Sequence, residues 1–117
     1  MKSIASLACV AVLLGFASMA VADPVGGPSR GVTRVQAYGV NVHKVLYRGG
    51  EQADFEIAGD GDTVLTLIVR DANGSEVIRI SGRGSLHTYW TPSQTSFYTI
   101  SVVNQGGVYN QYAYHAF

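Results

Sequence analysis

The chain has few cysteines, few lysines and little charge, and each shortage excludes a class of function. Its single cysteine, Cys9, lies near the start, so the rest of the chain has no thiol for a disulfide, for thiolate catalysis or for a cysteine-ligated zinc ion. Charged residues make up 14% of the sequence, and the formal net charge is zero. A nucleic-acid-binding surface needs clustered lysine and arginine, and Lys44 is the only lysine after residue 22. We therefore expect no nucleic-acid partner.

The first 22 residues have the layout of a secretory signal peptide. A basic start at Lys2 precedes an apolar stretch, 4–16, and the small residues Ala20 and Ala22 precede the expected cut. The apolar stretch is shorter than the about 20 residues that a membrane-spanning helix needs. We therefore expect a secreted or periplasmic protein that loses residues 1–22 and has no transmembrane segment in its mature chain.

The remaining residues have the size of one domain. Residues 23–30 are rich in proline and glycine and predict a flexible linker, and residues 31–117 predict a single folded domain. Apolar residues then recur with a period of two, and glycines and β-branched residues interrupt every helical pattern. The sequence therefore predicts an all-β chain. Its expected strands are Val32–Tyr38, Val40–Tyr47, Ala53–Ala58, Thr63–Arg70, Glu76–Ser81, Leu86–Trp90, Phe97–Asn104 and Val108–Ala116.

Short strands joined by regular turns are typical of a two-layer antiparallel β-sandwich, which buries alternate residues of each strand. The alternation predicts that Leu65, Leu67 and Val69 point into the core. Asn73-Gly74 predicts a tight hairpin turn in which both central residues have positive φ.

Six short stretches between residues 40 and 116 share the core and turn positions of a known family. They read YRGGEQA from Tyr47, GDGDT from Gly59, VRDANG from Val69, WTP from Trp90, YTISVVN from Tyr98 and VYNQY from Val108. Together they resemble the bacterial pre-peptidase C-terminal domains. The resemblance implies a jelly-roll-like antiparallel β-sandwich of seven or eight strands. It also implies a non-catalytic exported module, which we expect here as a freestanding module that binds a protein or polysaccharide partner.

The GDGD stretch before the fourth expected strand has two interpretations. Calcium takes six to eight oxygen ligands, and Asp60, Asp62 and Asp71 would supply carboxylates from adjacent loops. Members of the resembled family often have further aspartates in the next strand, where this chain has Val64 and Thr66. This departure favours a solvated Gly-Asp turn, so we expect no cofactor. Calcium is the alternative, and it would make the protein a calcium-stabilised adhesive module.

The spacing of the titratable residues indicates no catalytic set. His43, His87 and His115 lie on separate expected strands, without the close spacing typical of zinc ligands. Asp54 and Glu56 alternate onto one face of a strand, which we expect to be its solvated face. We therefore expect a protein that is not an enzyme. A small hydrolase on the same scaffold is the alternative, and a cleft with converging titratable residues would favour it.

Exposed aromatic rings are the remaining route to function, because they stack on sugars or on a protein partner. Tyr109 and Phe117, in the aromatic-rich C-terminal stretch, are the candidate binding residues. Tyr112 and Tyr114 are expected in the core instead, and Trp90 is expected to close an edge of the sandwich.

Overall fold

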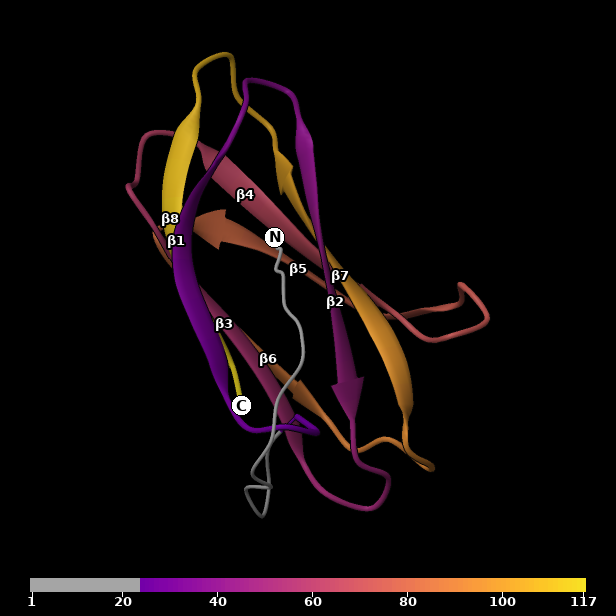
Figure 1. Ribbon diagram of the computed structural model, residues 1–117. Coiled ribbons are helices and arrows are strands. Elements are labelled where there is room, and N and C mark those ends of the chain that lie inside the picture. Colours follow the sequence, from indigo (N-terminus) through magenta and orange to yellow (C-terminus); the bar gives the residue numbers. More distant parts are fainter. Residues whose placement is uncertain (1–23) are drawn as a thin grey trace.

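Residues 24–117 are described by the computed structural model, and they form eight strands in two layers (Figure 1). The expected signal peptide and Cys9 lie outside the described residues. No helix with the length and apolarity needed to cross a membrane occurs among residues 24–117. The strands are β1 Ser29–Val35, β2 Val40–Tyr47, β3 Ala53–Gly59, β4 Val64–Arg70, β5 Glu76–Arg83, β6 Ser85–Trp90, β7 Ser96–Asn104 and β8 Asn110–Ala116.

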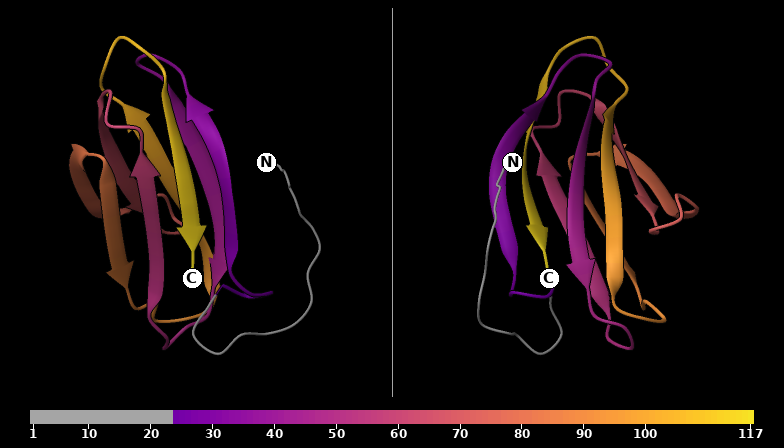
Figure 2. Two further views of the ribbon diagram at one scale, coloured as in Figure 1. Left: turned by 90° about the vertical axis from the view of Figure 1, so that its left-hand side faces the viewer. Right: turned by 45° about the vertical axis from the view of Figure 1, so that its right-hand side comes forward.

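The two sheets have the strand orders β1-β8-β3-β6 and β2-β7-β4-β5, and every pair is antiparallel. Consecutive strands therefore belong to different sheets, except β4 and β5, which pair with each other. This order is that of an eight-stranded jelly roll built from two Greek keys. Figure 2 shows the two layers facing each other. The all-β, jelly-roll-like sandwich that the sequence predicts is confirmed.

The core lies between the sheets and is filled by alternate residues of the strands. Leu65, Leu67 and Val69 of β4 are fully buried in it, as the alternation predicts. The other face of β4 is also covered, since Thr66 and Ile68 are buried as well. β4 is an interior strand, so side chains of β5 and β7 close over it from both sides.

Three aromatic rings fill one end of the core, which we call the Trp90 end. The rings of Tyr47 and Trp90 lie 5.1 Å apart, and those of Trp90 and Tyr98 lie 5.3 Å apart. The hydroxyl of Tyr47 donates a hydrogen bond of 2.7 Å to the backbone oxygen of Asp54. Trp90 is 9% exposed on the edge strand β6, so its expected place at an edge of the sandwich is confirmed.

β1 differs from the expected strand at both of its ends. It begins at Ser29, inside the segment expected as a linker, and it ends at Val35. The chain before it already follows the edge of the other sheet, where the N–H of Val25 donates to the oxygen of Leu46 at 2.8 Å. The strand stops early because the backbone turns at Tyr38, which has a φ of 54°.

The β4–β5 hairpin has a different turn from the one that Asn73-Gly74 predicts. Gly74 has a φ of 85°, but Asn73 does not have a positive φ. The N–H of Gly74 donates to the oxygen of Asp71 at 3.0 Å, and the N–H of Asp71 donates to the oxygen of Ser75 at 3.0 Å. These bonds make a four-residue turn that ends in a left-handed glycine, which is typical of a longer hairpin loop with a bulge.

Candidate functional site

Three loops meet at the end of the sandwich opposite Trp90, which we call the Tyr38 end. They are residues 36–39 between β1 and β2, 60–63 between β3 and β4, and 105–109 between β7 and β8. The strand register places them together, because Val35 pairs with Asn110 and Leu65 pairs with Asn104. Figure 1 shows these connections gathered at one end of the molecule.

The buried side chain of Asn104 joins two of the loops. Its amide nitrogen donates to the backbone oxygens of Gln36 at 3.1 Å and Val108 at 2.8 Å. Its amide oxygen accepts the N–H of Gly106 at 3.0 Å. A direct bond of 3.0 Å from the N–H of Tyr38 to the oxygen of Gly106 adds to this clamp. The conformations of the two loops are therefore set by part-buried hydrogen bonds to the buried Asn104, which are costly to break.

A second buried asparagine, Asn110, fixes the third loop. Its amide nitrogen donates to the hydroxyl of Thr63 at 3.0 Å, and its oxygen accepts the N–H of Asp60 at 3.3 Å. Asp60 in turn accepts the N–H of Gln111 at 2.9 Å. The β3–β4 loop is thereby attached to β8.

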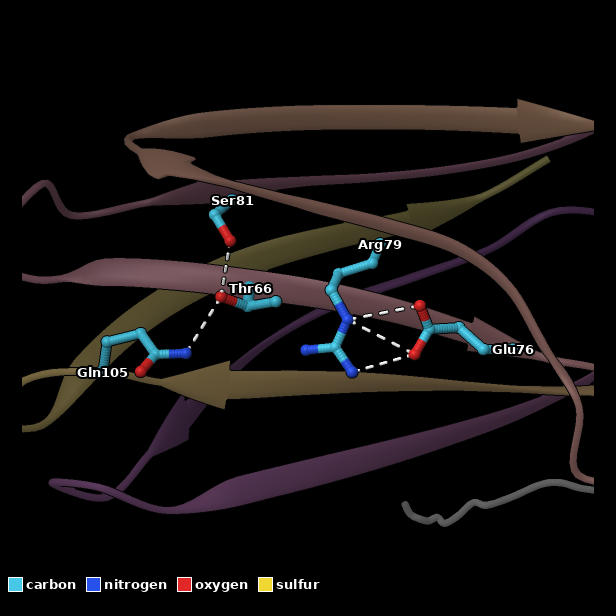
Figure 3. Close-up of polar contacts among 5 residues, drawn as sticks. All are labelled: Thr66, Glu76, Arg79, Ser81 and Gln105. Carbon is cyan, nitrogen blue, oxygen red and sulfur yellow. Dashed lines mark hydrogen bonds and ion pairs between the residues drawn. The ribbon is translucent and has the colours of Figure 1, made fainter.

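The 105–109 loop is also tied to the outer face of the sheet β2-β7-β4-β5. The amide nitrogen of Gln105 donates to the hydroxyl oxygen of Thr66 at 3.0 Å, and the hydroxyls of Thr66 and Ser81 lie 2.7 Å apart (Figure 3). On the same face Arg79 and Glu76 form an ion pair of 2.8 Å. These polar groups are paired with one another, so this face anchors the loop.

The fixed loops present apolar side chains to solvent. Tyr38 is 75% exposed, Val108 is 54% exposed and Tyr109 is 46% exposed. The guanidinium carbon of Arg34 lies 4.4 Å from the centre of the Tyr109 ring, a cation–π contact. A positive φ in an aromatic residue such as Tyr38 is uncommon and costs free energy, so it persists where the surrounding structure imposes it.

A hollow of about 420 Å³ lies between the second and third loops, and Val108 lines it. Polar side chains of Asp62, Arg83 and Gln105 line it together with the backbone of 106–107. The guanidinium group of Arg83 donates a hydrogen bond of 3.0 Å to the backbone oxygen of Asp62 in the β3–β4 loop. The Tyr38 end therefore combines exposed rings with groups that donate and accept hydrogen bonds.

The three aspartates of the expected calcium site do not converge. Asp60 and Asp62 precede β4 and Asp71 follows it, so a seven-residue strand of about 20 Å separates them. Asp71 accepts the N–H groups of Asn73 and Ser75 within its own hairpin. No group of three or more potential metal-ligating side chains occurs in the described part of the chain. The structure thus corrects the three-carboxylate set.

The carboxylate of Asp60 binds backbone groups of a turn. It accepts the N–H of Asp62 at 2.9 Å and that of Gln111 at 2.9 Å. These bonds, first that of Gln111 and then that of Asp62, hold the pKa of Asp60 below its ordinary value of 3.8. Both carboxylate oxygens are therefore already used in joining the turn to β8.

His43 belongs to the interior and is separate from the other two histidines. Its ring lies 4.5 Å from that of Tyr114, and its Nε2 lies 2.8 Å from the hydroxyl of Tyr112. Tyr112 is buried in the core and Tyr114 packs against it, as the sequence predicts. Burial raises the pKa of both tyrosine hydroxyls, which stay neutral hydrogen-bonding groups.

A second hollow, a groove of about 460 Å³, lies on the outer face of the sheet β1-β8-β3-β6. Small and apolar side chains form one cross-strand row in it, and titratable or charged side chains form the next row. The first row is Val32, Ala113, Ala58 and Ser85. The second row is Arg30, His115, Glu56 and His87. Sequence spacing did not predict this juxtaposition, because it depends on strand order and register.

Each of the two histidines that line the groove lies beside a carboxylate. Nε2 of His87 lies 2.8 Å from Oδ1 of Asp54, and Nδ1 of His115 lies 3.7 Å from Oε2 of Glu56. Asp54 is only 8% exposed, so its expected solvated position is wrong. Asp54 is buried because Phe117, which follows β8, pairs with it. The backbones of Phe117 and Asp54 exchange two N–H to oxygen hydrogen bonds of 2.7 and 2.9 Å.

No family model matches the chain, and no curated protein matches it in sequence. Several solved structures match its fold. The pre-peptidase C-terminal domain of a collagenase from Bacillus anthracis is 8% identical with a TM-score of 0.58, and the match covers 73% of this chain and 86% of that one.

Two further solved structures are similar to the chain in fold. A periplasmic inhibitor of g-type lysozyme from Aeromonas hydrophila is 10% identical with a TM-score of 0.56, over 86% of this chain and 90% of that one. A mitogen from Yersinia pseudotuberculosis is 14% identical with a TM-score of 0.53, over 80% and 85%. At these identities the likeness shows the fold alone. The chain is similar to pre-peptidase C-terminal domains at the level of the β-sandwich.

Proposed function

We propose that the protein is an exported, non-catalytic binding module that holds a neutral polysaccharide at the Tyr38 end. The observation that carries the proposal is the Tyr38 ring itself. It is 75% exposed, it has a left-handed backbone conformation, and its loop is clamped by the buried Asn104. An exposed ring on a fixed loop is suited to contact with a ligand.

The chemistry of the Tyr38 end favours a sugar chain. The apolar face of a tyrosine ring packs on the apolar face of a sugar, and its hydroxyl stays in water or binds a sugar hydroxyl. Tyr38 and Tyr109 supply two such rings, and the hollow between the second and third loops adds the polar residues Asp62 and Arg83. Because the loops are already fixed, binding loses little conformational entropy.

Two further observations support a binding role. The signal-peptide layout of residues 1–22 supports export to a compartment in which the protein would meet polysaccharides. Among the similar structures are a periplasmic lysozyme inhibitor and an accessory domain of a collagenase, and neither is the catalytic domain of an enzyme. The inhibitor also makes a protein partner the second candidate for the same loops, because tyrosine and arginine are frequent in the centres of protein interfaces.

Native gel electrophoresis in the presence of soluble neutral polysaccharides tests the proposal. The panel is mixed-linkage β-glucan, xylan, galactomannan and pullulan. We expect at least one of them to slow the protein, and the Tyr38→Gly and Tyr109→Ala variants to lose that effect. The matched control is Tyr89→Ala, because Tyr89 is 63% exposed on a different part of the surface. Unchanged mobility with all four polysaccharides would contradict a polysaccharide ligand and leave the protein partner.

A further inference from the structure

The groove on the outer face of β1-β8-β3-β6 shares no lining residue with the hollow at the Tyr38 end. Its charged row crosses all four strands in the order Arg30, His115, Glu56, His87. Neighbouring strands lie about 4.8 Å apart, so the two histidines flank Glu56 on either side. The side chain of His87 is 48% exposed, that of His115 is 24% exposed and that of Glu56 is 46% exposed. All three are therefore accessible to a ligand.

The positions of both imidazoles are set by their neighbours. Each has a carboxylate beside it, and the ring of Phe117 stacks on both, with centroids 4.3 Å from His115 and 5.8 Å from His87. A guanidinium nitrogen of Arg30 lies 3.4 Å from Nε2 of His115.

The sign of the charge in the groove depends on the two histidines. The charged groups that face them are Arg30 from β1, with Asp54 and Glu56 from β3. With neutral imidazoles these groups give one positive and two negative charges. With both imidazoles protonated they give three positive and two negative charges. Protonation of both imidazoles therefore changes the net charge of these groups from −1 to +1, and imidazole is the side-chain group that ordinarily gains a proton between pH 8 and pH 5.

We infer that the groove is a second ligand site, which takes an anionic group such as a carboxylate, sulfate or phosphate ester when His87 and His115 are protonated. The neighbouring row leaves room for that group, because Ala58, Ala113 and Ser85 have small side chains. At higher pH the two carboxylates repel the same anion. This site is independent of the polysaccharide proposal, and either can fail alone.

The experiment titrates the purified protein with inorganic sulfate at pH 5.0 and at pH 8.0, at constant ionic strength. Binding is measured by the change in the NMR chemical shifts of the backbone amides. We expect saturable shifts at Ala58, Ser85 and Ala113, with binding about ten-fold tighter at pH 5.0, as two added charges imply. A His87→Gln, His115→Gln variant is expected to lose the difference between the two pH values. A Gln111→Ala variant on the same strand face is the control and is expected to keep it.

Equal sulfate binding at both pH values, no saturable binding at pH 5.0, or full pH dependence in the doubly substituted variant would overturn the inference. Each single histidine variant, with its thermal unfolding recorded, serves if the double variant does not fold. Oligogalacturonate and oligoglutamate then distinguish the source of the anion at pH 5.0. Tighter binding of oligogalacturonate supports an acidic sugar as the ligand, and tighter binding of oligoglutamate supports an acidic peptide.

Discussion

The two ends of the sandwich use aromatic residues in opposite ways. At the Trp90 end three rings are buried and pack on one another, so the end of the core is closed by apolar side chains. At the Tyr38 end the core is closed by two buried asparagines, and the rings of Tyr38 and Tyr109 remain in solvent. Because polar clamps fix these loops, the rings are not needed for packing and are available for a ligand.

The largest effect is expected from truncation at the Trp90 end. Trp90→Ala should lower the free energy of unfolding by about 3–5 kcal/mol, because a buried ring is replaced by a cavity. The buried indole N–H has no hydrogen-bond partner among the described residues, so Trp90→Phe should cost clearly less. Urea unfolding measures both. The matched change at the other end, Tyr109→Ala, should cost at most about 1 kcal/mol, because it removes an exposed ring and its cation–π contact with Arg34, and an equal loss at both ends would contradict the contrast.

A smaller loss is expected when the polar clamp is removed. Asn104→Ala leaves the part-buried carbonyl oxygens of Gln36 and Val108 without this donor, which should cost about 1–2 kcal/mol. In this variant, hydrogen exchange at the N–H groups of Tyr38 and Gly106 should accelerate more than hydrogen exchange at the Trp90 end. Unchanged exchange at these two amides would show that the loops do not depend on Asn104.

Asp60→Asn should lower the unfolding temperature modestly and in a pH-dependent way. The folded-state pKa of Asp60 lies below 3.8, so the stabilisation is present above that pH and is lost as the pH falls through the folded-state pKa. The variant and the parent should therefore differ at pH 7 and converge at low pH. A difference that grows on acidification would contradict this assignment.

The same variant tests the calcium alternative. Both oxygens of Asp60 bind backbone N–H groups, and Asp71 lies at the other end of β4, so calcium or a chelator should change the unfolding temperature little. A rise with calcium that Asp60→Asn abolishes would restore a cation site in this loop.

Little net change in stability is expected for Tyr38→Gly. Glycine relieves the cost of the left-handed backbone, but it also makes the unfolded chain more flexible, so the two effects should cancel to within about 1 kcal/mol. Thermal unfolding measures the sum. A loss as large as that of Trp90→Ala would mean that the exposed ring is part of the core after all.

The alternation of apolar residues was sufficient to predict an all-β sandwich, whereas the jelly-roll arrangement was implied by the family resemblance. Leu65, Leu67 and Val69 are buried as expected, since a period of two defines which side of a strand faces the core. The boundaries of β1 were not predictable, because its end depends on the φ of Tyr38 and on a bond to Gly106 in a loop far along the chain.

The site was predictable only in part. Sequence reasoning singled out Tyr109 and Phe117, and it missed Tyr38 because that residue continues the alternation of the first strand. It grouped Asp71 with Asp60 because Asp60 precedes and Asp71 follows the same strand. The two residues lie at opposite ends of that strand, so its full length separates them. The histidine groove depends on the pairing of β3 with β6 and β8, which no local pattern contains.

Isothermal titration calorimetry with the polysaccharide that slows the protein in gels tests the central claim most directly. The account predicts that Tyr38→Gly and Tyr109→Ala each weaken binding about ten-fold while the free energy of unfolding stays nearly unchanged. Tyr89→Ala should bind as the parent does. Parent-like affinity in both loop variants would contradict a ligand site at the Tyr38 end.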